Sequence, residues 1–385
     1  MNYIALQMLF GDRGKYIAMI VGITFAALIM TQQPSIFLGL ISRTYSYVGE
    51  ITLPDIWVMD PTVDFVEESK PMRDTELQRV RGVEGVDWAV PLFKGLLTVL
   101  LPDGQRKIID VSGVDDATLI GAPRIMLKGN IADLRRDDGI IIDANAASER
   151  YSITDPVTGK KRPLGMGDVL EINDQRAVVV GIAQMERTFT TQPLAFTTFA
   201  RALRYAPGQR RLLTYILVKA RAGEAPEAVA RRIKDVTGLT AYTREEFKNV
   251  NRTYWMKNTG IPINFGISVF LGFLVGAAIA GQTFFSFVRE NQKQFAALKA
   301  MGVRNRTLMR MVALQALVVG AIGYGIGVGL SALFGTAMRG TVLAFYMPWQ
   351  LLLFSGGGVL LIVTLAALLS VRTVVRLDPA TVFRS

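Results

Sequence analysis

The 385-residue chain is half hydrophobic, carries a formal net charge of +11, and contains neither cysteine nor histidine. These absences exclude a disulfide framework, a thiol nucleophile, histidine-ligated zinc and Ser-His-Asp catalysis. The hydrophobic residues are gathered in long runs, and much of the basic excess lies beside them. This distribution predicts a membrane protein with a large soluble part, and it fits membrane orientation better than nucleic-acid binding. We expect no catalytic residue and no metal site.

The first apolar run is long enough to cross a membrane. Together with a short basic lead it occupies residues 1–44. A polar break in the run contains Gln32 and Gln33, which could line a substrate groove but more commonly hydrogen-bond to neighbouring helices. A cleaved signal peptide is the alternative, but no small-residue cleavage site follows the run closely.

Residues 45–255 show a different pattern, in which charges return, apolar runs shorten and turn residues recur. We therefore expect a large α+β domain with a β-rich lobe inserted at about 130–205. Alternating apolar runs predict strands, and capped amphipathic stretches predict helices. The expected elements are strands at 55–60, 212–220 and 239–243, a hairpin at 86–104, a strand with a short helix at 139–151, a strand pair turning at Asn173-Asp174 within 166–184, and helices at 74–83 (opened by Asp74) and 225–238 (ended by Gly238).

Three further apolar runs predict transmembrane helices at 256–288, 311–335 and 349–371. Tyr254 and Trp255 precede the first of these, and their chemistry suits a water–lipid boundary. The middle run contains two overlapping pairs of glycines, each four residues apart, which permit close packing within the chain or between copies. These glycines are Gly323, Gly325, Gly327 and Gly329.

The segment 289–310 is short, strongly basic and lies between two of the apolar runs. Because Lys and Arg resist translocation, we expect it to be a cytoplasmic loop. Four spans then place both termini, including the tail 372–385, in the cytoplasm. The short turn 336–348 and the domain 45–255 lie outside. The predicted fold is a polytopic α-helical membrane protein with four transmembrane helices and an α+β extracytoplasmic domain between the first two.

The sequence around this loop resembles the FtsX/MacB-type (type VII) ABC transporter permeases. FAALKAMGVRNRTLMRMVALQALVVGAIGYGIG at 295–327 is similar to that family's short cytoplasmic helix, Ala-x-Gly turn and Gly-rich third span. LDPATVF at 377–383 resembles its terminal Asp-Pro-Ala element. Residues 245–282 are most similar to the DevC-like branch, and 165–183 resemble the strand pair of MacB-type periplasmic domains.

The resemblance implies a homodimeric permease in a bacterial inner membrane that couples a separate ABC ATPase to its periplasmic domain. ATP and Mg²⁺ would be bound by that partner, and this chain indeed has no P-loop motif. The DevC-like match implies export of an amphiphile such as a glycolipid, with a membrane-fusion adaptor and an outer-membrane tunnel. The expected groove-lining residues are Gln32, Gln33 and Gln282, and the expected ATPase-docking residues are Glu290, Lys293, Phe295, Leu298, Lys299, Met301, Gly302 and Arg304.

One position departs from the family pattern, because Gln294 stands where an acid is usual. Glu290, one turn earlier, could take the place of that acid. Other roles fit the same plan: a transmembrane signal transmitter that regulates a periplasmic cell-wall hydrolase, or a permease that releases lipoproteins. A membrane-anchored enzyme is a further alternative, for which the sequence offers no evident acid–base pair.

Overall fold

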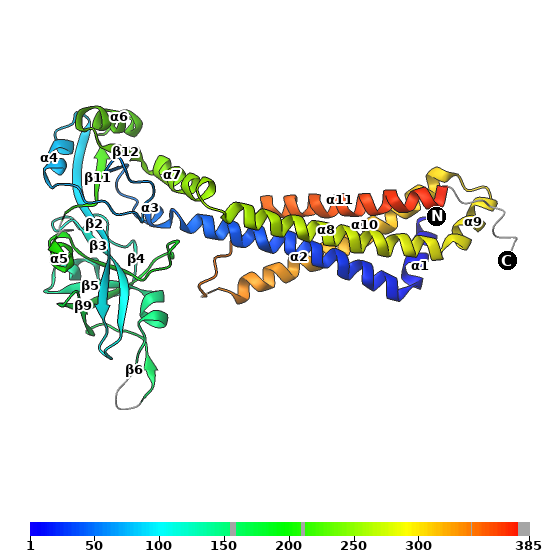
Figure 1. Cartoon of the computed structure of the whole chain (residues 1–385), viewed down its shortest axis with the longest axis horizontal. Coiled ribbons are helices and arrows are strands. Elements are labelled where there is room, and N and C mark those ends of the chain that lie inside the picture. The colour runs from blue at the N-terminus through cyan, green and yellow to red at the C-terminus, as the bar shows by residue number, and fades with distance from the viewer. Residues whose placement is uncertain (155–158, 209–211, 340, 376–385) are drawn as a thin grey trace. The chain divides into compact units, whose positions relative to one another are not determined.

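The chain folds into two compact units in this computed structural model (Figure 1). We name them the helical unit, Met1–Leu40 with Gly260–Ser385, and the sheet unit, Ile41–Thr259. The terminal element expected at 377–383 lies outside the residues that the structure describes. The described residues are 1–154, 159–208, 212–339 and 341–375.

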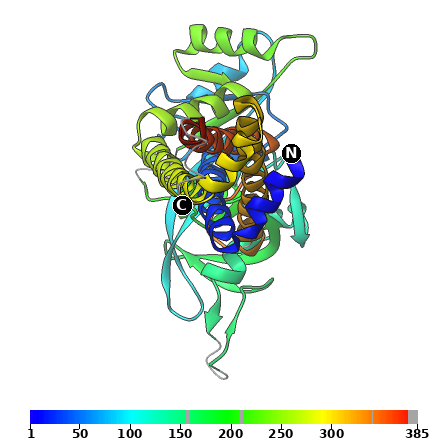
Figure 2. The same ribbon diagram turned by 90° about the vertical axis from the view of Figure 1, so that its right-hand side faces the viewer.

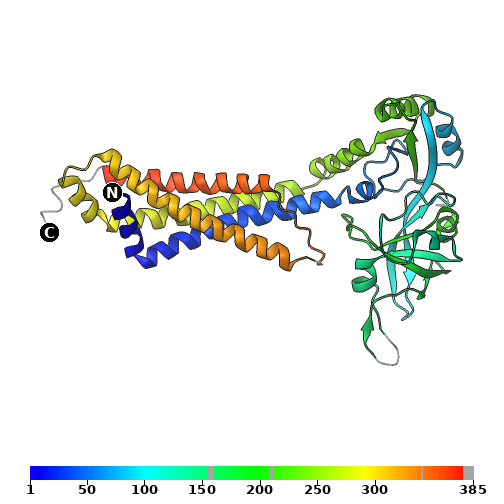
Figure 3. The same ribbon diagram turned by 180° about the vertical axis from the view of Figure 1, so that it is seen from behind.

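The helical unit contains the four apolar runs, and each run forms one continuous helix (Figure 3). Among the described residues, four helices are long and apolar enough to cross a membrane, as expected. The unit also has two shorter helices: α1 precedes α2, and α9 lies between α8 and α10. The helices are α1 (Asn2–Gly11), α2 (Arg13–Arg43), α8 (Ile261–Glu290), α9 (Gln292–Ala300), α10 (Asn305–Ala337) and α11 (Trp349–Val375).

Helix α2 packs closely against both α8 and α10 through small residues (Figure 2). A Cβ added at Gly276 of α8 would lie 2.2 Å from the Ala26 side chain. One added at Gly327 of α10 would lie 2.6 Å from the Ala27 side chain. Real Cβ atoms do not approach so closely, so glycine at these positions is what allows the helices to meet.

The two overlapping glycine pairs of α10 have different surroundings. Gly323 faces Ile23 of α2, and Gly327 contacts the next turn of the same helix. A Cβ added at Gly325 or Gly329 would meet no atom within 4 Å. One pair therefore packs within the chain, whereas the other lies on an open face of α10.

The sheet unit is built on one mixed sheet of ten strands. Its strands are β1 (Ile56–Met59), β2 (Val86–Leu100), β3 (Arg106–Val114), β4 (Ile125–Lys128), β5 (Gly139–Asp143), β8 (Val169–Ile172), β9 (Gln175–Gln184), β10 (Leu194–Thr198), β11 (Tyr215–Ala220) and β12 (Thr240–Thr243). Their order is β12-β1-β11-β2-β3-β10-β5-β9-β4, and β8 pairs with β2 and β9. Because β1 pairs with both β11 and β12, the first and last parts of the domain pack together, as expected.

The β-rich lobe begins earlier than the expected range of about 130–205. Strand β2 is long enough to pair with β11 through its first half and with β3 through its second half. One core of buried side chains consequently runs from Phe93 to Ala206. The remaining elements are α3 (Ser46–Glu50), α4 (Thr75–Arg81), α5 (Phe199–Tyr205), α6 (Pro226–Thr237), α7 (Arg244–Lys257), η1 (Ile131–Arg135), η2 (Ala146–Arg150), β6 (Ile153–Thr154) and β7 (Lys161–Arg162).

Several local sequence signals are confirmed in the sheet unit. Asn173 and Asp174 both have positive φ, as the tight turn of a two-residue β-hairpin requires. Gly238 ends α6 with a φ of 74°. The Asp74 carboxylate accepts a hydrogen bond from the Thr75 N–H and caps α4.

Tyr254 and Trp255 pack against aromatic rings of the sheet unit, and their expected place at a water–lipid boundary stays a prediction. The Tyr254 ring stacks on Phe65 with centroids 4.7 Å apart. The Trp255 ring lies 3.8 Å from the Phe189 ring and 5.5 Å from Phe65. These aromatic partners come from two loops that are distant in sequence. The amphipathic rings of Tyr254 and Trp255 therefore pack within the sheet unit.

Glu67 is a largely buried acid beside the buried pair Lys94 and Asp110. Burial is the main cause that raises the pKa of Glu67 above its usual 4.5, with Lys94 opposing and Asp110 reinforcing this shift. The folded protein therefore holds this proton to a higher pH than the unfolded chain does. The contribution of Glu67 to stability is most favourable below pH 4.5 and falls as pH rises towards the folded pKa.

Glu67→Gln is accordingly expected to stabilise the sheet unit at neutral pH relative to the wild type. The advantage should shrink as pH falls towards 4.5, because the wild-type carboxyl then becomes neutral as well. Urea unfolding of both proteins at a series of pH values measures this difference. A difference that is independent of pH would contradict the burial of an ionisable Glu67.

Candidate functional site: a groove between α1 and α9

Helix α9 is a short rigid element between α8 and α10. Asn291 alone separates it from α8. At its other end the Val303 N–H donates to the Leu298 carbonyl at 3.1 Å, and the Gly302 N–H donates to the Lys299 carbonyl at 3.0 Å. These two bonds, with a φ of 90° at Gly302, form a Schellman motif. Gly302 therefore ends the helix, as the sequence predicts.

Phe295 and Leu298 are buried in the core of the helical unit. They pack in one cluster with side chains of α8 and α10, such as Phe287 and Val312. Phe295 is fully buried, whereas Leu298 is 8% exposed and also lines the groove described below, so the docking role of both side chains stays a prediction. The apolar face of α9 holds the helix on its own bundle, which leaves its other faces and the groove to a partner.

Helix α1 forms the other wall of the site. Its Ala5 and Leu9 side chains are buried. The Nε2 of the fully buried Gln315 on α10 donates to the Ala5 carbonyl at 2.7 Å. The sequence analysis missed this helix, because no capping residue begins it and no acid lies in its first turn. The available signals were the i, i+4 pairs Ile4/Met8 and Ala5/Leu9.

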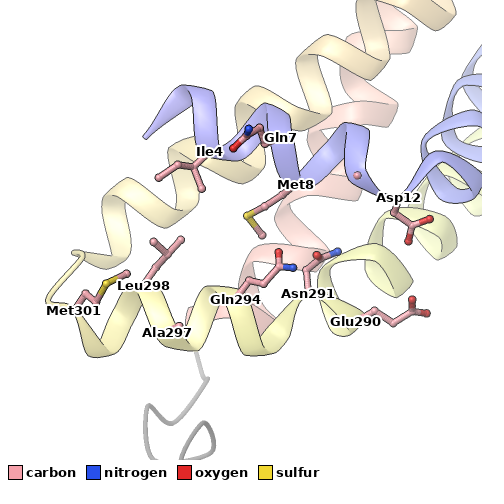
Figure 4. Close-up of a pocket in the computed structure, with 11 residues that line it drawn as sticks. Ile4, Gln7, Met8, Asp12, Glu290, Asn291, Gln294, Ala297, Leu298 and Met301 are labelled. Carbon is pink, nitrogen blue, oxygen red and sulfur yellow. The ribbon is translucent and has the colours of Figure 1, made fainter.

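A groove of about 740 Å³ lies between α1 and α9 (Figure 4). Apolar side chains of both helices line it, together with the side-chain amides of three polar residues. Figure 4 shows the side chains from α1 facing those from α9 across the groove. Such a mixture suits an apolar side chain of a partner whose polar rim hydrogen-bonds to the amides. The lining includes Ile4, Met8 and Leu298, the amides Gln7, Asn291 and Gln294, and the carboxylates Asp12 and Glu290.

Charged residues gather where α1 meets α2. Glu290 forms an ion pair with Lys15, and Lys15 also lies 3.0 Å from Asp12. The hydrogen bond with Lys15 lowers the pKa of Asp12. Glu290, the acid expected to replace the usual one at Gln294, is thus paired within the chain.

The remaining predicted docking residues lie on the outer side of α9 and its turn. The Met301 side chain is 73% exposed. Lys299 is half-buried, whereas the other residues of this side, Gly302 included, are exposed. We name the docking face by its four exposed side chains, which are Lys293, Gln294, Met301 and Arg304.

The predicted groove-lining glutamines occupy different positions. Gln32 and Gln33 are half-buried on α2, and Gln282 is exposed on α8. The polar break around Gln32 does not interrupt α2, which continues through Pro34. Within this break the Ser35 hydroxyl donates to the Thr31 carbonyl at 2.7 Å. Their role in lining a groove stays a prediction.

Two family models together span most of the chain. The model of the MacB-like periplasmic core domain matches residues 17–236, which is more than half of the chain. The model of the FtsX-like permease C-terminal region matches residues 266–379. The chain belongs to the FtsX/MacB-type permease family. This permease is therefore a member of a class of ABC transporter membrane proteins, with membrane-spanning helices and a domain outside the membrane.

Two solved structures are similar to part of this permease. The extracellular domain of the noncanonic ABC-type transporter YknZ from Gram-positive bacteria is 13% identical, with a TM-score of 0.34, over 49% of this chain and 98% of that one. The periplasmic region of MacB from Actinobacillus actinomycetemcomitans is 9% identical, with a TM-score of 0.37, over 52% of this chain and 94% of that one. No curated protein matches the permease.

Proposed function

We propose that this permease is the membrane subunit of an ATP-driven exporter in which a separate ABC ATPase binds the docking face and the groove. The observation that carries this proposal is the arrangement of α9. Its apolar side is buried in its own bundle, while Met301 projects beside the groove between α1 and α9. An apolar side chain of the ATPase would enter the groove, and its acidic residues would meet Lys293 and Arg304.

The coupling follows from the connections of α9. A force on this helix passes to α8 through the single linking residue Asn291 and to α10 through the short turn after Gly302, and to both through the packed side chains of its buried face. Residues 258–260 join α8 in turn to α7 of the sheet unit. ATPase closure would therefore tilt α8 and move α7, which transmits the cycle mechanically to the sheet unit.

The orientation is part of the proposal. The loop that carries α9 is rich in Lys and Arg, which supports a cytoplasmic position for α9 and both termini. The sheet unit then lies in the periplasm of a bacterium, and the helical unit lies in its inner membrane. ATP and Mg²⁺ are bound by the partner ATPase.

The exported substrate is an amphiphile such as a glycolipid, transferred to a membrane-fusion adaptor and an outer-membrane tunnel. The similarity of residues 245–282 to the DevC-like branch supports this assignment. The permease acts as a homodimer. Gly325 and Gly329, which have open space around them, and the exposed Gln282 offer surfaces on α10 and α8 for a second copy.

Met301→Asp is expected to weaken ATPase binding at least about tenfold, because it places a charge at the centre of the docking face. The tagged permease would be purified in mild detergent, and the co-purifying ATPase would be quantified. Met166→Asp is the matched control, because Met166 is 48% exposed and lies in the sheet unit. Equal ATPase recovery from the two variants would overturn the docking assignment.

A further inference from the structure

The loop between β9 and β10 joins two strands of the β-rich lobe, and its side chains and backbone contact the rest of the sheet unit. Both strands lie in the lobe, with β9 beside β5 and β10 between β5 and β3. Residues 186–192, which we name the relay segment, contact α3, α7 and the loop that follows β1. The segment is therefore a bridge whose two ends continue into lobe strands.

One set of contacts joins the relay segment to α3. The Ser46 hydroxyl donates to the Arg187 carbonyl at 3.1 Å. The Glu186 N–H donates to a carboxylate oxygen of Glu50 at 3.4 Å. Only two residues separate the end of α2 from the start of α3 at Ser46.

A second contact joins the relay segment to α7. The Phe189 ring lies 3.8 Å from the Trp255 ring, both measured at the centroids. Trp255 is in the last turn of α7, and three residues join the end of this helix to α8. Phe65 contacts the same end of α7, but it belongs to the loop after β1, which lies in the other half of the sheet.

The relay segment is also held from its other sides. Thr188 is buried, and its carbonyl accepts the Thr191 N–H at 3.1 Å in a tight turn. The Thr190 N–H donates to the Glu67 carboxylate at 3.4 Å. The Arg150 guanidinium of η2, within the lobe, donates to the Gln192 side chain at 3.3 Å. These contacts make the relay segment part of one packed and hydrogen-bonded network, which is the kind of network that can carry coupling.

We propose that the relay segment transmits displacement of α7 to the β-rich lobe, and that the Phe189–Trp255 contact is the point at which the displacement enters. The proposal rests on the proposed function, because it requires that the ATPase moves α8 and with it α7. Tightly packed rings resist compression, so a shift of Trp255 must displace Phe189. Phe189 is joined by the backbone to β9 and β10, which carry the displacement into the lobe.

Hydrogen exchange of the full permease with its co-purified ATPase in nanodiscs tests the relay. Exchange would be measured by mass spectrometry without nucleotide and with ATP plus vanadate. In the wild type we expect a nucleotide-dependent change in α7 and in β9 and β10. Phe189→Ala is expected to keep the change in α7 and to lose the change in both strands. A purely structural role of Phe189 would alter exchange in α7 and in the strands together.

Phe65→Ala is the matched control, because it removes another ring that packs on Trp255 and leaves the Phe189–Trp255 contact in place. It is expected to keep the change in both strands. Phe189→Tyr retains the ring and is expected to restore the response, which separates signal loss from poor folding. A full response of β9 and β10 in Phe189→Ala would overturn the relay alone. No response of α7 in the wild type would overturn the relay together with the proposed coupling.

Discussion

Gly327→Leu is expected to leave little folded permease, whereas Gly329→Leu leaves the fold intact. A Cβ at Gly327 would lie 2.6 Å from the Ala27 side chain and 2.8 Å from the Thr24 carbonyl oxygen. The carbonyl belongs to the backbone of α2, so α2 and α10 must separate to admit a leucine. Overpacking of this kind costs about 1–3 kcal/mol or more.

Gly329 is the internal control, because a Cβ there meets no atom within 4 Å. The measurement is the monodisperse fraction and the thermal midpoint of each variant in detergent. A fold that is equally damaged by both leucines would contradict the open environment of Gly329. A folded Gly329→Leu that has become monomeric would support a contact between copies on this face of α10.

Asp110→Ala is expected to destabilise the sheet unit by about 3–5 kcal/mol, because it removes the carboxylate that forms an ion pair with the buried Lys94 ammonium. The Lys94 and Asp110 side chains form an ion pair and are only 3% and 5% exposed. The Lys94 ammonium also lies 4.5 Å from the centre of the Tyr47 ring. The Tyr47 hydroxyl and the Ser112 hydroxyl are hydrogen-bonded at 2.8 Å, which fixes the ring in the core.

The double variant Lys94→Met/Asp110→Leu is expected to recover much of the lost stability, since both members of the buried ion pair are then removed. Unfolding in urea, followed by tryptophan fluorescence, measures both effects, because three of the four tryptophans, including the buried Trp57, lie in the sheet unit. A double variant no more stable than Asp110→Ala would contradict the account. The loss would then arise from packing, and the unpaired charge would play no part.

Periodicity and composition were sufficient to predict the four long helices and the α+β domain. They also predicted turns and helix ends, such as the Asn173-Asp174 turn and the end of α9 at Gly302, because the residues that specify these features lie within a few positions of each other. The extent of the lobe was harder to predict. The sequence predicts a hairpin at 86–104, whereas residues 86–100 form the single strand β2, and nothing local shows that its two halves pair with different neighbours.

The candidate site was predicted only in part. The sequence placed α9 correctly. Periodicity shows that a helix has an apolar face, but it does not show whether that face packs on the same chain or on a partner. Phe295 and Leu298 were assigned to a partner, and both also pack in the core of their own bundle, with Leu298 lining the groove as well. Helix α1 was missed because much of its stability comes from tertiary contacts such as the Gln315 hydrogen bond, which have no local signature.

The most direct test of the central claim is photo-cross-linking from the docking face. Benzoylphenylalanine would replace Met301 in one variant and the exposed Met166 of the sheet unit in another. After irradiation of native membranes, mass spectrometry would identify the cross-linked proteins. We predict that a P-loop ATPase is cross-linked at position 301 and not at position 166. Cross-linking of position 301 only to lipid or to other proteins would contradict the account.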